Sequence, residues 1–230
     1  MNTQIPLVLL HGALNNADIW APVLPSLPEA LVLDLPGHGE NRDAPLPTLE
    51  ALADWVWLEL DRRGLGSVIL VGHSMGSLIA LEAAARQPAR AQGLVMIGTA
   101  FPMRVSPALL EMAASEPENA IALVDEYSRA LPDPHSQLLK LMMRESAANP
   151  DLLRHDLRLC DSYTGALAAA EMVRCRVQMI LGEQDRMTPP RKAQALADAL
   201  RATVHTLPCG HALMSEAAAK VAEILKEPYP

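Results

Sequence analysis

Residues 67–76 read Ser67-Val68-Ile69-Leu70-Val71-Gly72-His73-Ser74-Met75-Gly76, and an Ala- and Leu-rich segment follows directly. An aliphatic run, a Gly-x-Ser-x-Gly pentapeptide and a helical segment in this order are typical of a buried strand, a sharp turn and a helix. The flanking glycines suit this turn because it leaves no room for Cβ atoms beside the serine. An ordinary strand-to-helix turn is the alternative. We predict that Ser74 is a nucleophile.

Composition and charge restrict the class of protein. The chain has 230 residues, about half of them hydrophobic, which suits one domain with a well-filled core. Its formal net charge is −8, and no Lys/Arg cluster exceeds two adjacent residues. A nucleic-acid partner is therefore not expected.

The cysteines and the N-terminus indicate the compartment. The three cysteines lack the spacing of metal ligands, so we expect reduced thiols in a cytoplasmic protein and no metal. The first apolar run, residues 5–10, has no positive charge before it and is too short for a signal peptide or a membrane span. We expect no membrane partner.

Strand-like and helical segments alternate along most of the chain. Continuous apolar runs bounded by turn residues suit strands that are buried on both faces of a parallel sheet. Residues 5–10 and 30–35 are such runs, and further strand-like segments lie at residues 67–71, 92–98, 176–182 and 202–207. Amphipathic or Ala-rich helical segments lie between them, including residues 48–64, which Thr48 caps and Gly64 ends. The pattern predicts an α/β fold with helices on both faces of the sheet.

Residues 101–173 break the alternation. They read as four or five helical segments separated by prolines, with no strand-like run. We therefore predict a core of residues 1–100 and 174–230 and a helical lid of residues 101–173. Because ligands of open α/β sheets bind at the carboxyl ends of the strands, a lid at that edge would line the pocket.

A serine hydroxyl needs a base that removes its proton and an acid that orients the base. Where the nucleophile occupies a strand-to-helix turn, the acid and the histidine follow it in that order, each after a later strand. Asp185 follows the strand at 176–182, and His211 follows the strand at 202–207. Glu183 is the alternative acid, but the residues after Asp185 favour Asp185. We predict that Asp185 and His211 complete the triad.

Backbone N–H groups are the expected donors to a developing oxyanion. One donor is Met75, the residue after the nucleophile, and the other lies in the loop after the first strand, which begins His11-Gly12-Ala13-Leu14. Gly12 permits the turn, so we assign the second donor to Ala13. We expect Leu14 and His73 to contact the substrate.

These residues together resemble the α/β-hydrolase superfamily, specifically its small lidded esterases and C-C hydrolases. The resemblance covers nearly the whole chain through five motifs: His11-Gly12, Asp34-Leu35-Pro36-Gly37-His38-Gly39, Gly72-His73-Ser74-Met75-Gly76, Gly182-Glu183-Gln184-Asp185 and Gly210-His211. It implies a Ser74-His211-Asp185 triad and no cofactor. Only four residues precede the first run, so the family's N-terminal hairpin is expected to be absent and the sheet to have about six strands.

The expected activity is hydrolysis of a small carboxylic ester through an acyl-enzyme. The same triad would also serve C-C bond, thioester or lactone hydrolysis, or elimination, and a slow-turnover ligand receptor of this fold is a further alternative. An acidic substrate would need a cation in the cleft, for which Arg104, Arg129 and Arg144 are candidates. An acidic carrier protein is disfavoured because acidic residues outnumber basic ones in the lid.

Overall fold

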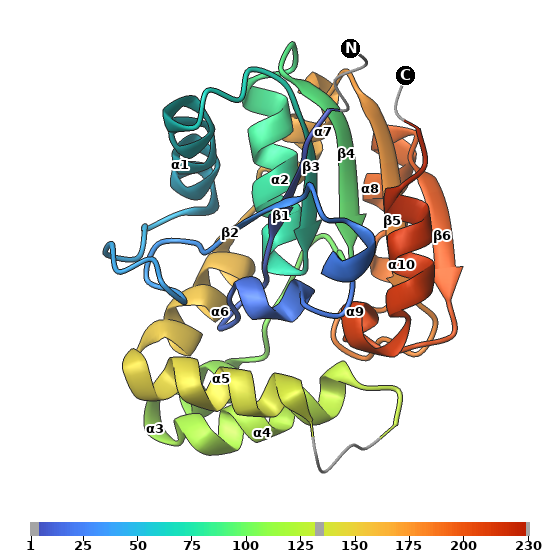
Figure 1. Ribbon diagram of the computed structural model, residues 1–230. Helices are drawn as coiled ribbons and strands as arrows, with labels where there is room; N and C mark the ends of the chain where they lie inside the picture. The colour runs from blue at the N-terminus through green and yellow to red at the C-terminus, as the bar shows by residue number, and fades with distance from the viewer. Residues whose placement is uncertain (1–4, 132–135, 229–230) are drawn as a thin grey trace.

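A six-stranded parallel sheet forms the centre of the protein in a computed structural model, which describes residues 5–131 and 136–228 (Figure 1). The strand order is β2-β1-β3-β4-β5-β6, and each neighbouring pair is parallel. The strands are β1 (Leu7–Leu10), β2 (Leu31–Leu33), β3 (Val68–His73), β4 (Ala91–Ile97), β5 (Arg176–Gly182) and β6 (Thr203–Leu207). The prediction of an α/β fold with a parallel sheet of about six strands is confirmed.

Side chains that alternate along each strand separate the core into two layers. In β1, Val8 and Leu10 pack on one face of the sheet, whereas Leu7 and Leu9 pack on the other. Both layers are apolar, which is why β1 reads as a continuous hydrophobic run rather than as an alternating one.

Helices cover both faces of the sheet (Figure 1). One face carries α1 (Leu49–Arg62), α2 (Met75–Arg86), α7 (Ala166–Met172) and α8 (Gln194–Leu200). The other carries α9 (Leu213–Glu216), α10 (Ala218–Leu225) and the short 3-10 helices η1 (Ala17–Trp20) and η2 (Leu24–Ser26). A third 3-10 helix, η3 (Pro190–Lys192), precedes α8.

Helix α1 shows how local sequence sets an element's bounds. The Thr48 side chain accepts a hydrogen bond from the Ala51 N–H at 3.1 Å, and Gly64 follows the helix with a φ of 70°. The side-chain cap satisfies one of the free N–H groups of the first turn. This helix therefore begins and ends close to the positions that its sequence predicts.

The described residues between β4 and β5 form five helices. Helices α3 (Pro107–Ser115), α4 (Pro117–Ser128) and α5 (Gln137–Ala148) lie at the end of the sheet to which the strand arrows point, and α6 (Leu152–Ser162) leads from them back toward the sheet (Figure 1). Helix α7 instead packs against α2 and α8 in the core. Within the predicted lid range of 101–173, helices α3–α6 therefore lie toward the carboxyl ends of the strands, and α7 lies in the core.

Among the described residues, no helix is long and apolar enough to cross a membrane.

Candidate active site

The turn between β3 and α2 holds Ser74 in a strained backbone conformation. Its φ is 53° and its ψ is −120°, a region that non-glycine residues rarely occupy. The Ser74 N–H bonds the Ile97 carbonyl at 2.9 Å, and the Ser77 hydroxyl donates to the Ser74 carbonyl at 2.6 Å. These bonds hold the turn so that Ser74 stands at the edge of the sheet.

The two glycines of the motif are required by close packing. A Cβ atom on Gly72 would lie 2.0 Å from the Gly76 carbonyl oxygen, and one on Gly76 would lie 2.4 Å from the His11 carbonyl oxygen. At these two positions the first turn of α2 therefore lies directly against the backbone at the ends of β3 and β1.

This packing predicts that Gly72→Ala destabilises the fold. The added methyl overlaps backbone atoms that cannot rotate away, and we expect a loss of more than about 3 kcal/mol in the free energy of unfolding. Urea denaturation followed by circular dichroism measures it. Gly66→Ala is the matched control, because a Cβ there meets no atom within 4 Å. Equal stability of the two variants would contradict this packing argument.

Asp185 and His211 meet beyond the ends of β5 and β6. The His211 Nδ1–H donates to Asp185 Oδ2 at 2.8 Å, and both side chains are buried. In the neutral ring this bond leaves the Nε2 lone pair free to accept a proton. Glu183, the alternative acid, is exposed.

Thr188 is a member of this network that the sequence analysis did not assign. Its hydroxyl lies 2.7 Å from Asp185 Oδ2, 2.9 Å from the Gly98 carbonyl and 3.0 Å from His211 Nδ1. The backbone N–H groups of Met187 and Thr188 donate to Asp185 Oδ1 at 2.8 and 2.7 Å. The three-residue spacing from Asp185 to Thr188 is the signal that predicts such a turn.

These contacts set the charge of Asp185. Burial alone would raise the pKa of its carboxyl group, but the neighbouring His211 and the hydrogen bonds from His211 and Thr188 lower the pKa to about 2. Asp185 is therefore ionised throughout the neutral range and holds the proton of His211 on Nδ1.

His73 packs against the ring of His211 and is hydrogen-bonded to its backbone. Its Nε2–H donates to the His211 carbonyl at 3.0 Å, and the two imidazole rings lie 4.7 Å apart between centroids. Burial, with a smaller contribution from the neighbouring His211, lowers the pKa of His73 to about 3, so His73 is neutral. It also lines the cavity described below.

The loop after β1 lies directly against the nucleophile. A Cβ atom on Gly12 would lie 3.0 Å from the Ser74 Cβ, so this loop and the turn at Ser74 are in contact. Ala13 lines the same cavity as Ser74. Met75 is the first residue of α2, where an N–H has no partner earlier in the helix.

Leu14 lies elsewhere than the sequence predicts. Its side chain is fully buried in an apolar cluster with lid residues and is not among those that line the cavity. The physical reason is its backbone: φ is 50°, and its N–H donates to Asp156 of α6 at 2.7 Å. Ala13 and Asn15, its neighbours in the same loop, do line the cavity.

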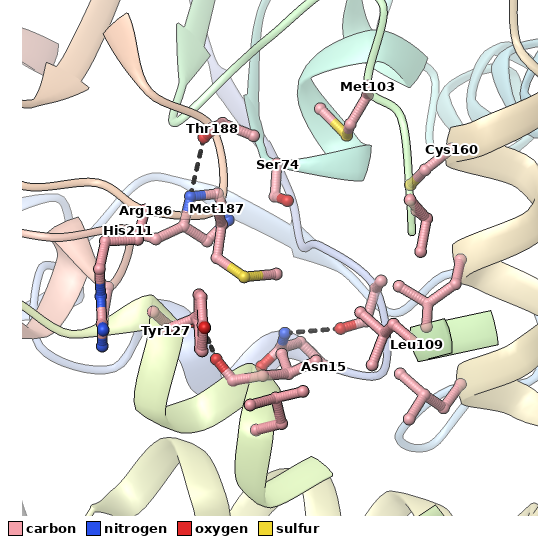
Figure 2. Close-up of a pocket in the computed structure, with 18 of the residues that line it drawn as sticks. Asn15, Ser74, Met103, Leu109, Tyr127, Cys160, Arg186, Met187, Thr188 and His211 are labelled. Carbon is pink, nitrogen blue, oxygen red and sulfur yellow. Dashed lines mark hydrogen bonds between the residues drawn. The ribbon is translucent and has the colours of Figure 1, made fainter. Parts of the chain in front are cut away.

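A cavity of about 340 Å³ lies between the lid and the carboxyl ends of the strands (Figure 2). Ser74 and His211 both line it, and Figure 2 shows both around the open space together with Met187 and Thr188. Most of its wall is apolar: Ile19, Met103, Val105, Leu109, Leu123, Val124, Leu138, Met142, Leu153, Leu157 and Met187 contribute to it. A site of this size and lining suits a small apolar ligand.

Three cationic side chains line this cavity: Arg104, Arg186 and Lys192. Arg104 is one of the arginines proposed from the sequence, whereas Arg129 pairs with Asp125 and Arg144 with Asp18 outside the cavity. The other two cations follow Asp185 closely in the chain and were not assigned from the sequence.

Cys160 also lines the cavity but is not a competing nucleophile in neutral solution. Burial raises the pKa of its thiol, so the sulfur keeps its proton. All three cysteines are free. The described residues contain no group of three His, Cys, Asp or Glu side chains placed to hold a metal ion.

A strained serine between strand and helix, a buried Asp-His pair after later strands and a lid over the strand ends define the architecture of α/β hydrolases. A model of the Alpha/beta hydrolase family matches residues 7–224, and the chain belongs to this family.

The chain is similar to several known proteins. It is 32% identical to a protein named pimeloyl-[acyl-carrier protein] methyl ester esterase, of Aromatoleum aromaticum, over 90% of each chain. Its fold resembles that of a thermophilic esterase, with a TM-score of 0.83, 24% identity and coverage of 97% of this chain and 89% of the other. It also resembles the enol-lactonase of Burkholderia xenovorans LB400, with a TM-score of 0.78, 20% identity and coverage of 97% and 90%.

Proposed function

We propose that this protein hydrolyses small carboxylic esters through an acyl-enzyme on Ser74. The observation that carries the proposal is the buried hydrogen bond of 2.8 Å between His211 and Asp185, in a cavity that Ser74 also lines. An imidazole oriented in this way is a base for an adjacent hydroxyl group.

The reaction has two steps. Ser74 Oγ attacks the ester carbonyl carbon while its proton moves to His211 Nε2, and that proton then leaves with the alcohol. A water molecule next loses its proton to His211 and attacks the acyl-enzyme, which releases the acid and restores Ser74. In both steps the N–H groups of Ala13 and Met75 stabilise the oxyanion.

The cavity supports an apolar acyl chain of small to medium length. Aliphatic and methionine side chains from α3–α6 form most of the wall above Ser74. The relative of Aromatoleum aromaticum is named as an esterase of a pimeloyl-[acyl-carrier protein] methyl ester. A methyl ester needs little space on the alcohol side, so the same bond in an apolar acid fits this cavity.

Two assays test the proposal. The first measures hydrolysis of p-nitrophenyl and methyl esters of straight-chain acids of increasing length, with lactones and thioesters as competitors. The second treats the protein with a fluorophosphonate and locates the label by peptide mass spectrometry. We expect turnover of the esters and a label confined to Ser74. Tight ligand binding without turnover would instead support the receptor alternative, and faster cleavage of lactones or thioesters would move the activity to that bond.

A further inference from the structure

A buried carboxylate of the lid is bonded to the loop that carries the oxyanion donor. Asp156, on α6, is 1% exposed and accepts the Leu14 N–H at 2.7 Å through Oδ2. The same oxygen accepts from His38 Nε2 at 2.9 Å. Asp156 therefore joins the lid to the loop after β1 and to the loop after β2.

A second lid carboxylate makes a parallel connection. Glu145, on α5, is 4% exposed and accepts the Gly39 N–H at 2.9 Å. Its other oxygen accepts from the Asn16 side chain at 2.7 Å. Two lid helices thus contact the same two core loops through buried charges rather than through apolar packing alone.

The bond from Asp156 fixes one peptide unit of a tight turn. The Asn15 N–H bonds the Gly12 carbonyl at 3.3 Å, so Gly12 to Asn15 form a β-turn whose third residue, Leu14, has a φ of 50°. Within that turn the Ala13 carbonyl accepts the Asn15 side-chain amide at 2.8 Å, and the Leu14 N–H is held by Asp156. Both ends of the peptide between Ala13 and Leu14 are therefore held.

This turn needs support because leucine disfavours a positive φ. Without the carboxylate, the Leu14 N–H would be buried with no acceptor. Rotation of the peptide between Ala13 and Leu14 would then relieve both the unfavourable φ of Leu14 and the unbonded N–H. Such a rotation changes ψ of Ala13 and φ of Leu14 and so opens the turn. The Ala13 N–H, which stands next to Ser74 in the proposed reaction, belongs to the preceding peptide, whose Gly12 carbonyl is held by the Asn15 N–H that closes the same turn.

We propose that Asp156 is a positioning residue for catalysis: it holds the turn at Ala13 in the geometry of the oxyanion hole only while the lid is docked on the core. The inference rests on the proposed function, which assigns the oxyanion donor to Ala13. Under this inference the lid affects stabilisation of the oxyanion as well as the shape of the pocket.

The bond to His38 gives this connection a dependence on pH. Burial alone would lower the pKa of His38, but the Asp156 carboxylate, the Pro36 carbonyl and Glu145 raise it. Both ring nitrogens donate, Nδ1 to the Pro36 carbonyl at 3.1 Å and Nε2 to Asp156, which only an imidazolium does. His11 also lies against the ring, and its own pKa is held well below its usual value, chiefly by burial.

A raised pKa in the folded state means that protonated His38 stabilises the fold at pH values below its ordinary 6.5. That contribution is lost as pH rises through the raised value. We therefore expect Asp156→Asn to lower the melting temperature more at about pH 6 than at about pH 9. Thermal denaturation of both proteins across this range measures the difference, and an equal shift at both ends would contradict the ion pair.

The decisive experiment compares Asp156→Ala, Asp156→Asn and, as the matched control, Asp151→Asn, an exposed acid at the start of the same helix whose side chain caps no N–H. For Asp156→Ala we expect kcat for a p-nitrophenyl ester to fall by about 10²-fold with KM changed little, and the affinity for a trifluoromethyl ketone to fall in proportion. Asp156→Asn keeps an oxygen for the Leu14 N–H and should retain kcat within about tenfold of the original. The control should be unchanged.

Each other outcome counts against the inference. A folded Asp156→Ala protein with the original kcat would overturn it. An equal loss of kcat in Asp156→Ala and Asp156→Asn would also overturn it. So would a rise in KM without a fall in kcat, because that result indicates only a disturbed lid. If Asp156→Ala does not fold, hydrogen exchange of the unaltered protein decides: the Leu14 amide should be strongly protected, and free exchange would overturn the inference. All these outcomes leave Ser74-dependent hydrolysis by the unaltered protein intact, so they are distinct from failure of the proposed function.

Discussion

Replacing Ser74 with alanine is expected to lower kcat for a p-nitrophenyl ester by about 10⁶-fold, because the variant has no oxygen to form the acyl-enzyme. Stability should change little, since alanine meets the same backbone strain as serine and the Ser77 hydroxyl still bonds the carbonyl of residue 74. Initial rates, with circular dichroism to show folding, measure both effects.

The control variant is Cys160→Ala, which removes the thiol that lines the same cavity. Cys160→Ala removes a buried thiol that keeps its proton, so turnover and phosphonate labelling should persist in it. Turnover by Ser74→Ala within about a hundredfold of the original would contradict the acyl-enzyme. If Ser74→Ala keeps this activity and Cys160→Ala loses it, the nucleophile is the Cys160 thiol.

The core of the fold could be predicted because its signals are local. β5 spans the residues that its apolar run indicates, Arg176–Gly182, and the strand order places its end beside β4 and β6. Strands buried on both faces, short turns and a capped helix each depend on residues close in the chain.

The details around the site depend on distant contacts. Nothing near Leu14 indicates a positive φ, because the acceptor that favours it, Asp156, lies 142 positions later. The packing of α7 is a second example: it is as helical in sequence as α6, and only the structure shows that it packs on α2 and α8. Helical periodicity predicts that one face of a helix is buried, but it does not predict which element that face packs against.

Asp185→Asn is expected to lower kcat by about 10⁴-fold, and the structure explains why the amide cannot simply replace the carboxylate. Two backbone N–H groups, of Met187 and Thr188, donate to Oδ1, so the oxygen of an asparagine would stay on that side. Its NH₂ group would then face His211 Nδ1 and donate to it.

Because residue 185 would then donate to His211 Nδ1 rather than accept from it, the tautomer of His211 would change. His211 would carry its proton on Nε2, the nitrogen that must accept the proton of Ser74, and the histidine would be a donor where a base is needed. Thr188 can turn its hydroxyl toward the Gly98 carbonyl at 2.9 Å, so the network stays hydrogen-bonded and the protein should fold. Kinetics should therefore show a loss of kcat with KM and the melting temperature nearly unchanged. Glu183→Gln, an exposed acid two residues earlier, is the control and should be fully active; if it loses activity while Asp185→Asn keeps it, the acid of the triad is Glu183.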